Sequence, residues 1–389
     1  MTTTYESTVA SLEEAVGRAT ALAADFAGRA AEHDRQASFP FENFEALRAA
    51  GLLNLSVPRE YGGSELGLAA ACRVVQQIAA GDAATALVLS MQYIFHAGLA
   101  RRRAWPEAVY AAVCRESANG IALINALRVE PELGTPSRGG MPATTASRTR
   151  DGWKLSGHKI YATGSPILRY FLVWARTDEE PARVGTFLLP REAPGWRLVE
   201  TWDHLGMRAT GSHDIILEDA LIPLDHAVDV RLPFDWGAPD PLVGAWNGLV
   251  LAALYHGVAT AARDWLTRYL HERVPANLGA PLASLPRFQS TVGEIEALLF
   301  TSEHLLHGLA AEIDAGDSAA AARASLAKYV VTNNAVRAVD MALGLVGNPG
   351  LSRTNPLERH HRDVLCSRIH SPQDDTVLLM TGKAALGMR

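Results

Sequence analysis

One stretch of this chain, residues 121–223, constrains its fold more than any other. Apolar residues there come in short bursts, such as residues 171–174 and 186–189, separated by turn-forming pairs such as Asp151-Gly152 and Pro194-Gly195. Short β-prone runs with turn signals at this spacing are typical of an antiparallel sheet or barrel. The sequence on both sides instead shows the three- and four-residue apolar spacing of helices. We therefore expect a mainly α fold with a central β domain.

The helical segments divide the chain into three expected domains, at residues 1–119, 120–230 and 231–389. In the first domain, the pattern predicts helices over residues 5–37, 41–53, 68–80, 83–102 and 105–117. A Pro-rich run at residues 232–241 is typical of a linker. Beyond it, long helices with one apolar face, which includes Ile295, Leu299 and Leu306, indicate a C-terminal bundle.

Charge and cysteine usage exclude several classes of partner and site. The formal net charge of -6 and a pI near 6.1 leave no basic stripe for nucleic acid or an anionic membrane. Three cysteines (Cys72, Cys114 and Cys366) lie far apart, which predicts a reducing cytoplasm and neither a disulfide framework nor a metal site. Apolar runs are shorter than the roughly 20 residues that a membrane span needs. A cytoplasmic protein without nucleic-acid, membrane or metal partners is expected.

Nucleotide-binding motifs of the usual kinds are missing from the sequence, which has no GxGxxG after an expected strand and no Walker loop. Two stretches of the sheet segment, residues 128–135 and 159–164, combine a strand end with glycine and a hydroxyl residue. Such stretches can present backbone N–H groups and an Oγ atom to a polar ring edge or a phosphate. Each is also compatible with an ordinary strand followed by a turn.

Ordered motifs run along nearly the whole chain: PREYGG (58–63), EPELGT (130–135), KIYATG (159–164), LGMRAT (205–210), EDALIP (218–223), ER (272–273), GN (347–348) and NPLERHHRD (355–363). In this order and spacing, the chain resembles the acyl-CoA dehydrogenase superfamily. The resemblance implies an N-terminal helical domain, a middle β-barrel and a C-terminal four-helix bundle. It also implies FAD between the last two domains and a dimer-based homotetramer.

Residue by residue, the resemblance implies roles around the flavin. The matched positions are Thr163 at flavin N5, Tyr161 beside the ring, Arg128, Val129, Gly134 and Thr135 along the polar edge and pyrophosphate, and Arg273, Gly347 and Asn348 toward the FAD of a neighbouring subunit. An arginine suits a pyrophosphate because its guanidinium donates two parallel hydrogen bonds. A solvated helix charge is the other interpretation of Arg273.

The catalytic base is where the sequence departs most from the family. Family dehydrogenases remove the substrate α-proton with a glutamate, and counting from the R-D motif places Ser371 at that position. The family's other base position falls at Asn247 or Gly248. An unassisted serine hydroxyl cannot act as a base near pH 7. A smaller departure is Val129, which stands where the flavin loop usually has threonine.

Residues 370–375 (HSPQDD) supply substitute groups. His370 has an ordinary pKa near ~6.5 and can take or give a proton; HSP is also similar to the H-[DS]-P string of flavin monooxygenases that share the fold. Asp374 or Asp375 could be carboxylate bases. The structural alternatives are capping of the following helix by the aspartates and a packing role for His370.

Three hypotheses follow from these matches and departures. In the first, the chain is an FAD-dependent oxidoreductase that dehydrogenates an acyl thioester of CoA or a carrier protein with a non-standard base. A second keeps the fold but makes the chain a two-component monooxygenase, using FAD or FMN, that acts on a small molecule. A third is a catalytically silent flavin-binding or interaction protein. Expected partners are the substrate, further copies of the chain, and a flavin reductase or an electron-transfer flavoprotein.

Overall fold

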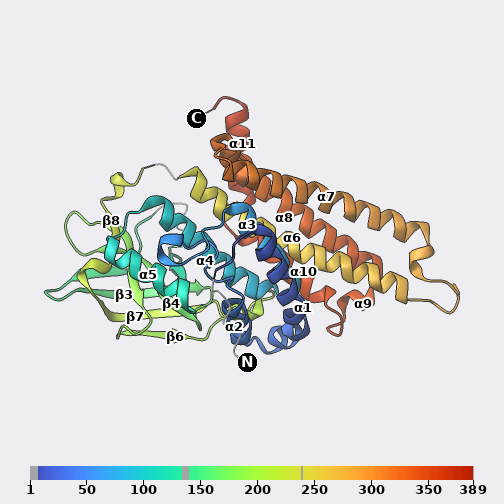
Figure 1. Cartoon of the computed structure of the whole chain (residues 1–389), viewed down its shortest axis with the longest axis horizontal. Coiled ribbons are helices and arrows are strands. Elements are labelled where there is room, and N and C mark those ends of the chain that lie inside the picture. Colours follow the sequence, from blue (N-terminus) through green and yellow to red (C-terminus); the bar gives the residue numbers. More distant parts are fainter. Residues whose placement is uncertain (1–7, 134–139, 238–239, 389) are drawn as a thin grey trace.

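Helices at both ends of the chain enclose a central sheet. The computed structural model describes residues 8–133, 140–237 and 240–388. Figure 1 shows the sheet in one lobe, the long C-terminal helices in the other, and N-terminal helices across their junction. The expected mainly α fold with a central β domain is confirmed.

The N-terminal helices form a layer over the junction of the two lobes. They are α1 (Leu12–Gln36), α2 (Phe41–Ala49), α3 (Leu68–Gly81), α4 (Ala83–Arg102) and α5 (Glu107–Asn119). Side-chain caps fix two of their starts: Ser11 accepts the Glu14 N–H at α1, and Asp82 accepts the Thr85 N–H at 3.1 Å at α4. Helices α3 and α4 pack on the C-terminal helix α6 (Pro241–Glu272), and α4 also contacts the first strand.

The middle region is a mixed sheet. Its strands are β1 (Leu123–Leu127), β2 (Thr145–Arg148), β3 (Trp153–Ala162), β4 (Leu168–Thr177), β5 (Val184–Pro190), β6 (Trp196–Val199), β7 (His213–Ile222) and β8 (Ala227–Arg231). The order is β6-β7-β3-β2-β4-β5-β8, with β1 beside β4. Most neighbours are antiparallel as expected, but β1 and β2 each run parallel to β4. The period-two pattern reports which face is buried and carries no information on strand direction.

The C-terminal helices form a bundle that extends away from the sheet (Figure 1). Besides α6, they are α7 (Pro286–Asp314), α8 (Ser318–Val346), the short α9 (Asn348–Leu351), α10 (Leu357–Leu365) and α11 (Asp374–Ala385). Helices α6, α7, α8 and α10 pack against one another, and Asp caps begin α6 and α8. By length and hydropathy α4 and α6 could each cross a bilayer, but both are mostly buried inside the protein.

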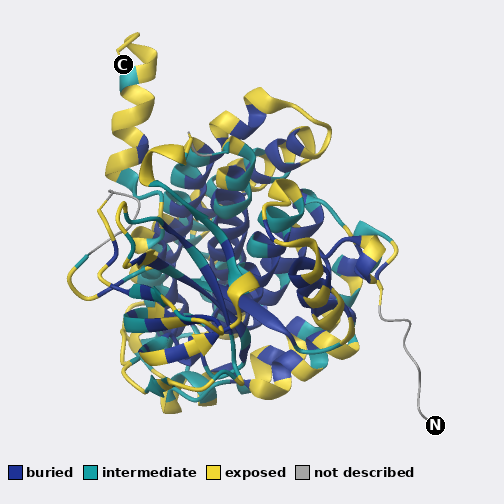
Figure 2. Ribbon diagram, turned by 90° about the vertical axis from the view of Figure 1, so that its left-hand side faces the viewer, coloured by how far each residue is buried: buried dark blue, intermediate teal, exposed yellow. Residues whose placement is uncertain are grey.

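Helix α11 differs from the rest of the bundle in its exposure. It projects from the body at the C-terminal end (Figure 2), and only part of it rests on α8. Leu378, Leu379 and Met380 are 48%, 60% and 61% exposed. Consecutive large apolar side chains in solvent are unusual for an isolated soluble chain and are typical of a contact surface.

Candidate functional site

The end of β3 presents an aromatic side chain to solvent. The pairing of β3 with β7 shifts register between Lys159 and Ala162, and Tyr161 adopts a left-handed φ of 60°. A bulge of this kind re-aims side chains and is frequent beside functional sites. Here it leaves Tyr161 51% exposed, with Trp202 and His204 edge-on at ring distances of 6.2 and 5.9 Å. Trp202 and His204 stack on each other at 3.7 Å, which gives this edge a rigid aromatic surface.

A row of hydroxyl groups lies beside this aromatic surface. Thr163 Oγ1 is 2.9 Å from Ser212 Oγ, which is 2.7 Å from Thr210 Oγ1. From the other side, Asn125 Nδ2 donates to the Thr163 carbonyl at 2.8 Å and ties Thr163 to β1. Each hydroxyl can both donate and accept, so the row can adjust to a ligand with either kind of polar atom.

The hydroxyl row continues into the C-terminal domain. Thr210 Oγ1 donates to the Met207 carbonyl at 2.9 Å, and the Met207 N–H donates to Asp363 Oδ1 on α10 at 2.7 Å. The backbones meet closely here, since a Cβ at Gly206 would lie 2.4 Å from the Arg362 carbonyl oxygen. Burial raises the pKa of Asp363 to about 7. The two domains therefore share one hydrogen-bonded junction behind Thr163.

An ion pair buried in the sheet domain supports the same edge. Lys159 and Glu130 have 0% and 3% exposed side chains, and Lys159 Nζ lies 2.6 Å from Glu130 Oε1. Lys159 also donates to the Trp174 carbonyl, and Thr144 donates both its N–H and its hydroxyl to Glu130. Burial lowers the pKa of Lys159 to about 8, against the attraction of Glu130. For Glu130, burial works to raise the pKa, but the hydrogen bonds outweigh it and lower the pKa.

The loop after β1 lies against the end of β3. The Val129 carbonyl accepts the Ile160 N–H at 3.0 Å, and the Arg128 guanidinium lies 4.6 Å from the centre of the Trp174 ring. The Val129 carbonyl thus lies next to the residue that precedes Tyr161, and the roles of Arg128 and Val129 toward a flavin stay predictions. Gly134 and Thr135, named for the same loop, lie outside the described residues.

A second group of candidate residues, named the bundle wall from here on, comes from the segment between α10 and α11. Lys328 of α8, with a fully buried side chain, donates to the carbonyls of His370 and Pro372 at 3.0 and 2.9 Å. Burial lowers the pKa of His370 to about 4, and the charge of Lys328 acts in the same direction. His370 is thus neutral near pH 7. Its buried Nε2 atom and the hydroxyl of Tyr255, whose rings are 5.8 Å apart, have no hydrogen-bond partner among the described residues.

The two family positions for a base meet in space. Asn247 Nδ2 donates to the Ser371 carbonyl at 2.7 Å, so both positions belong to one small region at the start of α6. Gly248, the neighbouring possibility, is buried against α8. A serine and an asparagine therefore occupy the place where the family's glutamate was expected, and neither side chain is a carboxylate.

Asp374 faces a different set of groups. Its Oδ2 atom accepts from Asn333 at 2.9 Å and its Oδ1 atom lies 3.9 Å from Lys328 Nζ. The structural alternative for the aspartates combined capping with a favourable helix dipole. Asp374 forms no cap bond, since Gln373 is the N-cap of α11 and has no side-chain cap bond. Asp374 and Asp375 instead occupy the first turn, where negative charge suits the helix dipole.

The residues expected to reach a second subunit lie at the far end of the bundle. Arg273 follows α6 and is exposed, and Gly347 and Asn348 stand exposed at the junction of α8 and α9. They have no contact with Tyr161 or His370 among the hydrogen bonds, ion pairs and ring contacts of the described chain. A site that uses all of them needs residues from two copies.

Several residues of this site carry no role in the sequence prediction. Lys159 and Glu130 belong to motifs that the sequence singled out, so their pairing could have been suspected. Asp363 likewise ends the motif at residues 355–363, whereas Ser212 and Lys328 become visible only in three dimensions, because their partners are far away in the chain.

Comparison with known proteins places the whole chain in one family. Sequence profiles described as "Acyl-CoA dehydrogenase" N-terminal, middle and C-terminal domains match residues 13–102, 130–220 and 249–374. The chain is 36% identical over 369 residues to "Putative acyl-CoA dehydrogenase YdbM" of Bacillus subtilis (strain 168), covering 94% of each chain.

Two further relatives carry other names. "Amino sugar nitrososynthase DnmZ" of Streptomyces peucetius is 29% identical, with 89% of this chain and 86% of that protein covered. The structure of KijD3, in complex with FMN and dTDP-3-amino-2,3,6-trideoxy-4-keto-3-methyl-D-glucose, is also 29% identical, with a TM-score of 0.80 over 97% and 94% of the two chains. Three consecutive domain matches and a relative above one-third identity over nearly full length agree with the fold, and the chain belongs to the acyl-CoA dehydrogenase family.

Proposed function

We propose that the protein is a flavin-dependent oxidoreductase whose isoalloxazine ring lies against the Tyr161 edge of the sheet. Family membership supports the oxidoreductase class. The residues fit such a ring, because a half-exposed aromatic side chain stands next to a hydroxyl row that can donate to or accept from a heteroaromatic edge. Thr163 would bond the ring, and Arg128 and Val129 would line its polar side.

FAD is the proposed cofactor, with FMN as the alternative, and the working unit is a homo-oligomer. Arg273, Gly347 and Asn348 lie too far along the bundle to join Tyr161 in one copy, so they would hold the diphosphate arm of a flavin bound to a neighbouring copy. The exposed apolar face of α11 supports self-association, since its large side chains lack cover in the isolated chain.

For the reaction, the geometry favours oxygenation of a small molecule over α,β-dehydrogenation. The observation that carries this proposal is the hydrogen bond from Asn247 to Ser371, which joins both family base positions without a carboxylate. A bound reduced flavin would supply two electrons, so that, with two protons, one atom of O2 enters the substrate and the other leaves as water. A flavin reductase is then the expected electron source. The likeness to DnmZ and to KijD3 supports the same direction.

His370 is the proposed proton-handling residue. As a neutral imidazole it carries one N–H and one free lone pair, so it can accept a proton at one nitrogen and donate from the other. Lys328 fixes the backbone on both sides of Ser371 and thereby orients the ring. Burial of Nε2 excludes water, which prevents loss of the proton to solvent.

Dehydrogenation of an acyl thioester is the second candidate. The likeness to YdbM favours it, and Asp374 is the carboxylate nearest to the Ser371 position in sequence. Against it, both oxygens of Asp374 point toward partners on α8, Asn333 and Lys328, and neither bonds a residue of the Tyr161 edge. In this candidate an electron-transfer flavoprotein would accept the electrons.

One preparation of flavin-loaded protein can distinguish the monooxygenase from the acyl-thioester dehydrogenase. Protein loaded with FAD or FMN is reduced and mixed with oxygen, and the rate of flavin reoxidation and the yield of hydrogen peroxide are measured. We expect His370→Gln to change that rate by about 10²-fold, the usual scale of one acid or base. His361→Gln is the matched control, because His361 is part-exposed and bonds Asp340.

Two outcomes would overturn the proposal. Anaerobic bleaching of the flavin by any acyl thioester of a chain-length panel would establish the dehydrogenase instead. Failure to bind either flavin, with the fold intact by circular dichroism, would favour the catalytically silent hypothesis.

A further inference from the structure

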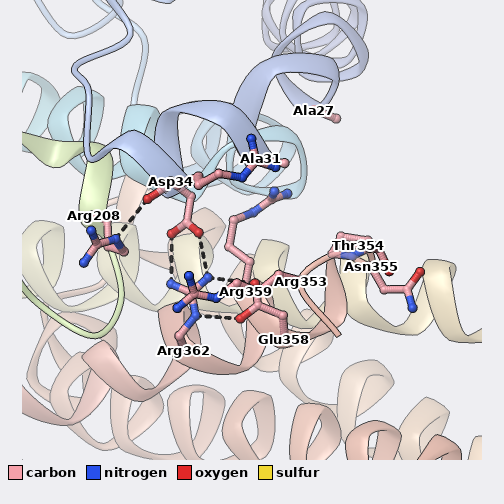
Figure 3. A pocket seen from close by; sticks show the side chains of 12 residues that line it. Ala27, Ala31, Asp34, Arg208, Arg353, Thr354, Asn355, Glu358, Arg359 and Arg362 are labelled. Carbon is pink, nitrogen blue, oxygen red and sulfur yellow. Dashed lines mark hydrogen bonds and ion pairs between the residues drawn. The ribbon is translucent and has the colours of Figure 1, made fainter. Parts of the chain in front are cut away.

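A pocket of about 220 Å³ lies on the side of the molecule where α1 meets α10. Figure 3 shows its lining residues, which come from α1, from the segment before β7 and from residues 353–362. Arginine dominates the lining: Arg35, Arg208, Arg353, Arg359 and Arg362, against the two carboxylates of Asp34 and Glu358. None of these residues belongs to the proposed flavin site.

The carboxylates of the pocket are already engaged. Arg362 donates to both oxygens of Asp34 at 2.9 and 2.7 Å and to both oxygens of Glu358. Arg208 bonds Asp203 and two backbone carbonyls. Asp34 and Glu358 thus share Arg362, and Asp203 pairs with Arg208, so the five guanidinium groups still outnumber these three carboxylates.

Arg359 is the unusual member. It is only 8% exposed, and no hydrogen bond or ion pair to its side chain occurs among the described residues, although its charge acts on Asp363 one turn further along. Its guanidinium nitrogens are not among the fully enclosed polar atoms that lack a partner, so its donors open into the pocket, where an anion could accept from them. Arg35 and Arg353 add exposed guanidinium groups that likewise have no ion pair in the described structure.

The start of α10 adds donors of another kind. Helix α10 begins at Leu357 after Pro356, with no side-chain cap, so its first N–H groups lack intrahelical acceptors. Such a terminus favours anions through both the free N–H groups and the helix dipole. The pocket is therefore lined by the mostly buried Arg359, by the exposed Arg35 and Arg353, and by residues at the start of α10.

We propose that this pocket binds a phosphate group, as inorganic phosphate or as the terminal phosphate of a small phosphomonoester. Planar guanidinium groups match the tetrahedral oxyanion by bidentate hydrogen bonds. At about 220 Å³ the pocket is smaller than the roughly 300 to 1,000 Å³ of sites that enclose a drug-sized ligand. It therefore suits the phosphate group and leaves any attached organic part outside.

The test is calorimetric titration of the flavin-loaded protein with inorganic phosphate, at constant ionic strength set by chloride. Saturable binding is expected for the natural sequence. Arg359→Gln should weaken it by at least about tenfold, as loss of a charged hydrogen-bonding partner does. Because a buried substitution can disturb folding, the exposed Arg353→Gln is the second variant, with a weaker effect in the same direction. Arg150→Gln, an exposed arginine in the turn between β2 and β3, should bind phosphate unchanged.

A parallel titration with FAD identifies the source of the phosphate. We expect Arg353→Gln to bind FAD as the natural sequence does. Loss of FAD affinity in that variant, without phosphate binding to the flavin-loaded protein, would show that the pocket serves the flavin diphosphate, and would overturn the proposal. Phosphate binding that survives both pocket substitutions would overturn it as well.

Discussion

Two fully buried lysines, one in the sheet domain and one in the C-terminal bundle, are held differently. Lys159 in the sheet lies 2.6 Å from a carboxylate that collects further hydrogen bonds from Thr144. Lys328 in the bundle bonds two neutral carbonyls, and its nearest carboxylate oxygen, on Asp374, is 3.9 Å away. The first ammonium is neutralised in place; the second is held mainly by backbone dipoles.

The region around Lys159, which we call the sheet wall, is held by a charge pair between side chains. The bundle wall around Lys328 is held through backbone carbonyls. The sheet wall, with Lys159 and Glu130, positions Tyr161 and Thr163, whose side chains match the family motif. The bundle wall anchors residues 370–372 through their carbonyls, which any residue type supplies. Side chains there can therefore change without loss of the anchor, and Ser371, the position at which the sequence motif predicts the family glutamate, lies between the two anchored carbonyls.

The largest expected effect comes from breaking the neutralised pair. Lys159→Met leaves Glu130 buried without its counter-charge, which costs about 3 to 5 kcal/mol of unfolding free energy. Urea denaturation followed by circular dichroism measures this loss. The matched control is Lys154→Met on the same strand, where an exposed pair with Asp219 is worth about 1 kcal/mol or less. Equal losses at the two positions would remove the distinction between the walls.

The second prediction concerns the carboxyl of Asp363, at the hydrogen-bonded junction of the middle and C-terminal domains. The pKa of Asp363 is raised to about 7 in the folded protein, so its stabilising contribution is full below the unfolded value near 3.8 and is lost as the pH rises through 7. Asp363→Asn keeps the oxygen that accepts from Met207 but does not ionise. Relative to the natural sequence, the variant should gain about 2 to 3 kcal/mol between pH 5 and pH 8.

Denaturation at a series of pH values measures this gain. His361→Gln, which leaves Asp363 intact, should keep the pH dependence of the natural sequence. A difference between Asp363→Asn and the natural sequence that stays constant with pH would show that the Asp363 carboxyl is already ionised, as Glu130 is.

The smallest expected effect is a shift in the pKa of His370 at the bundle wall. Lys328→Met removes a positive charge near His370, which makes the imidazolium less unfavourable and raises the pKa of His370 from about 4 by less than about one unit. The acid limb of the pH profile for flavin reoxidation should move up accordingly. Lys328→Arg keeps the charge and should leave the limb in place. A limb that stays fixed in Lys328→Met would assign Lys328 a purely structural role.

The sequence predicted most of the fold because its signals are local. Helix α4 begins and ends where the apolar spacing predicted, at Ala83 and Arg102, since Asp82 caps its start. By contrast, the parallel pairing of β1 with β4 depends on residues about 45 positions apart, and no local pattern reports it. Register and strand direction are properties of the assembled sheet.

For the site, the sequence located the right segments but not their partners. Tyr161 and Thr163 both lie at the end of β3, and their roles toward a flavin, like the role of the Ser371 position, stay predictions. The sequence did not reveal that Asn247 would donate to Ser371, or that Lys328 would hold His370 from another helix. The sequence also could not show how burial changes a pKa. The residue type alone gives His370 an ordinary pKa, whereas burial in the folded protein lowers that pKa to about 4 and keeps the imidazole neutral near pH 7.

Gly206 carries a consequence for engineering. Its α-carbon leaves so little space that a side chain would collide with the backbone of Arg362 on the opposite domain. A single methyl group placed there would collide with the Arg362 carbonyl oxygen, so Gly206→Ala requires the two backbones to move apart. The hydrogen bond from Met207 to Asp363 lies one residue away, and the same substitution would therefore strain the polar contact by which the two domains hold each other.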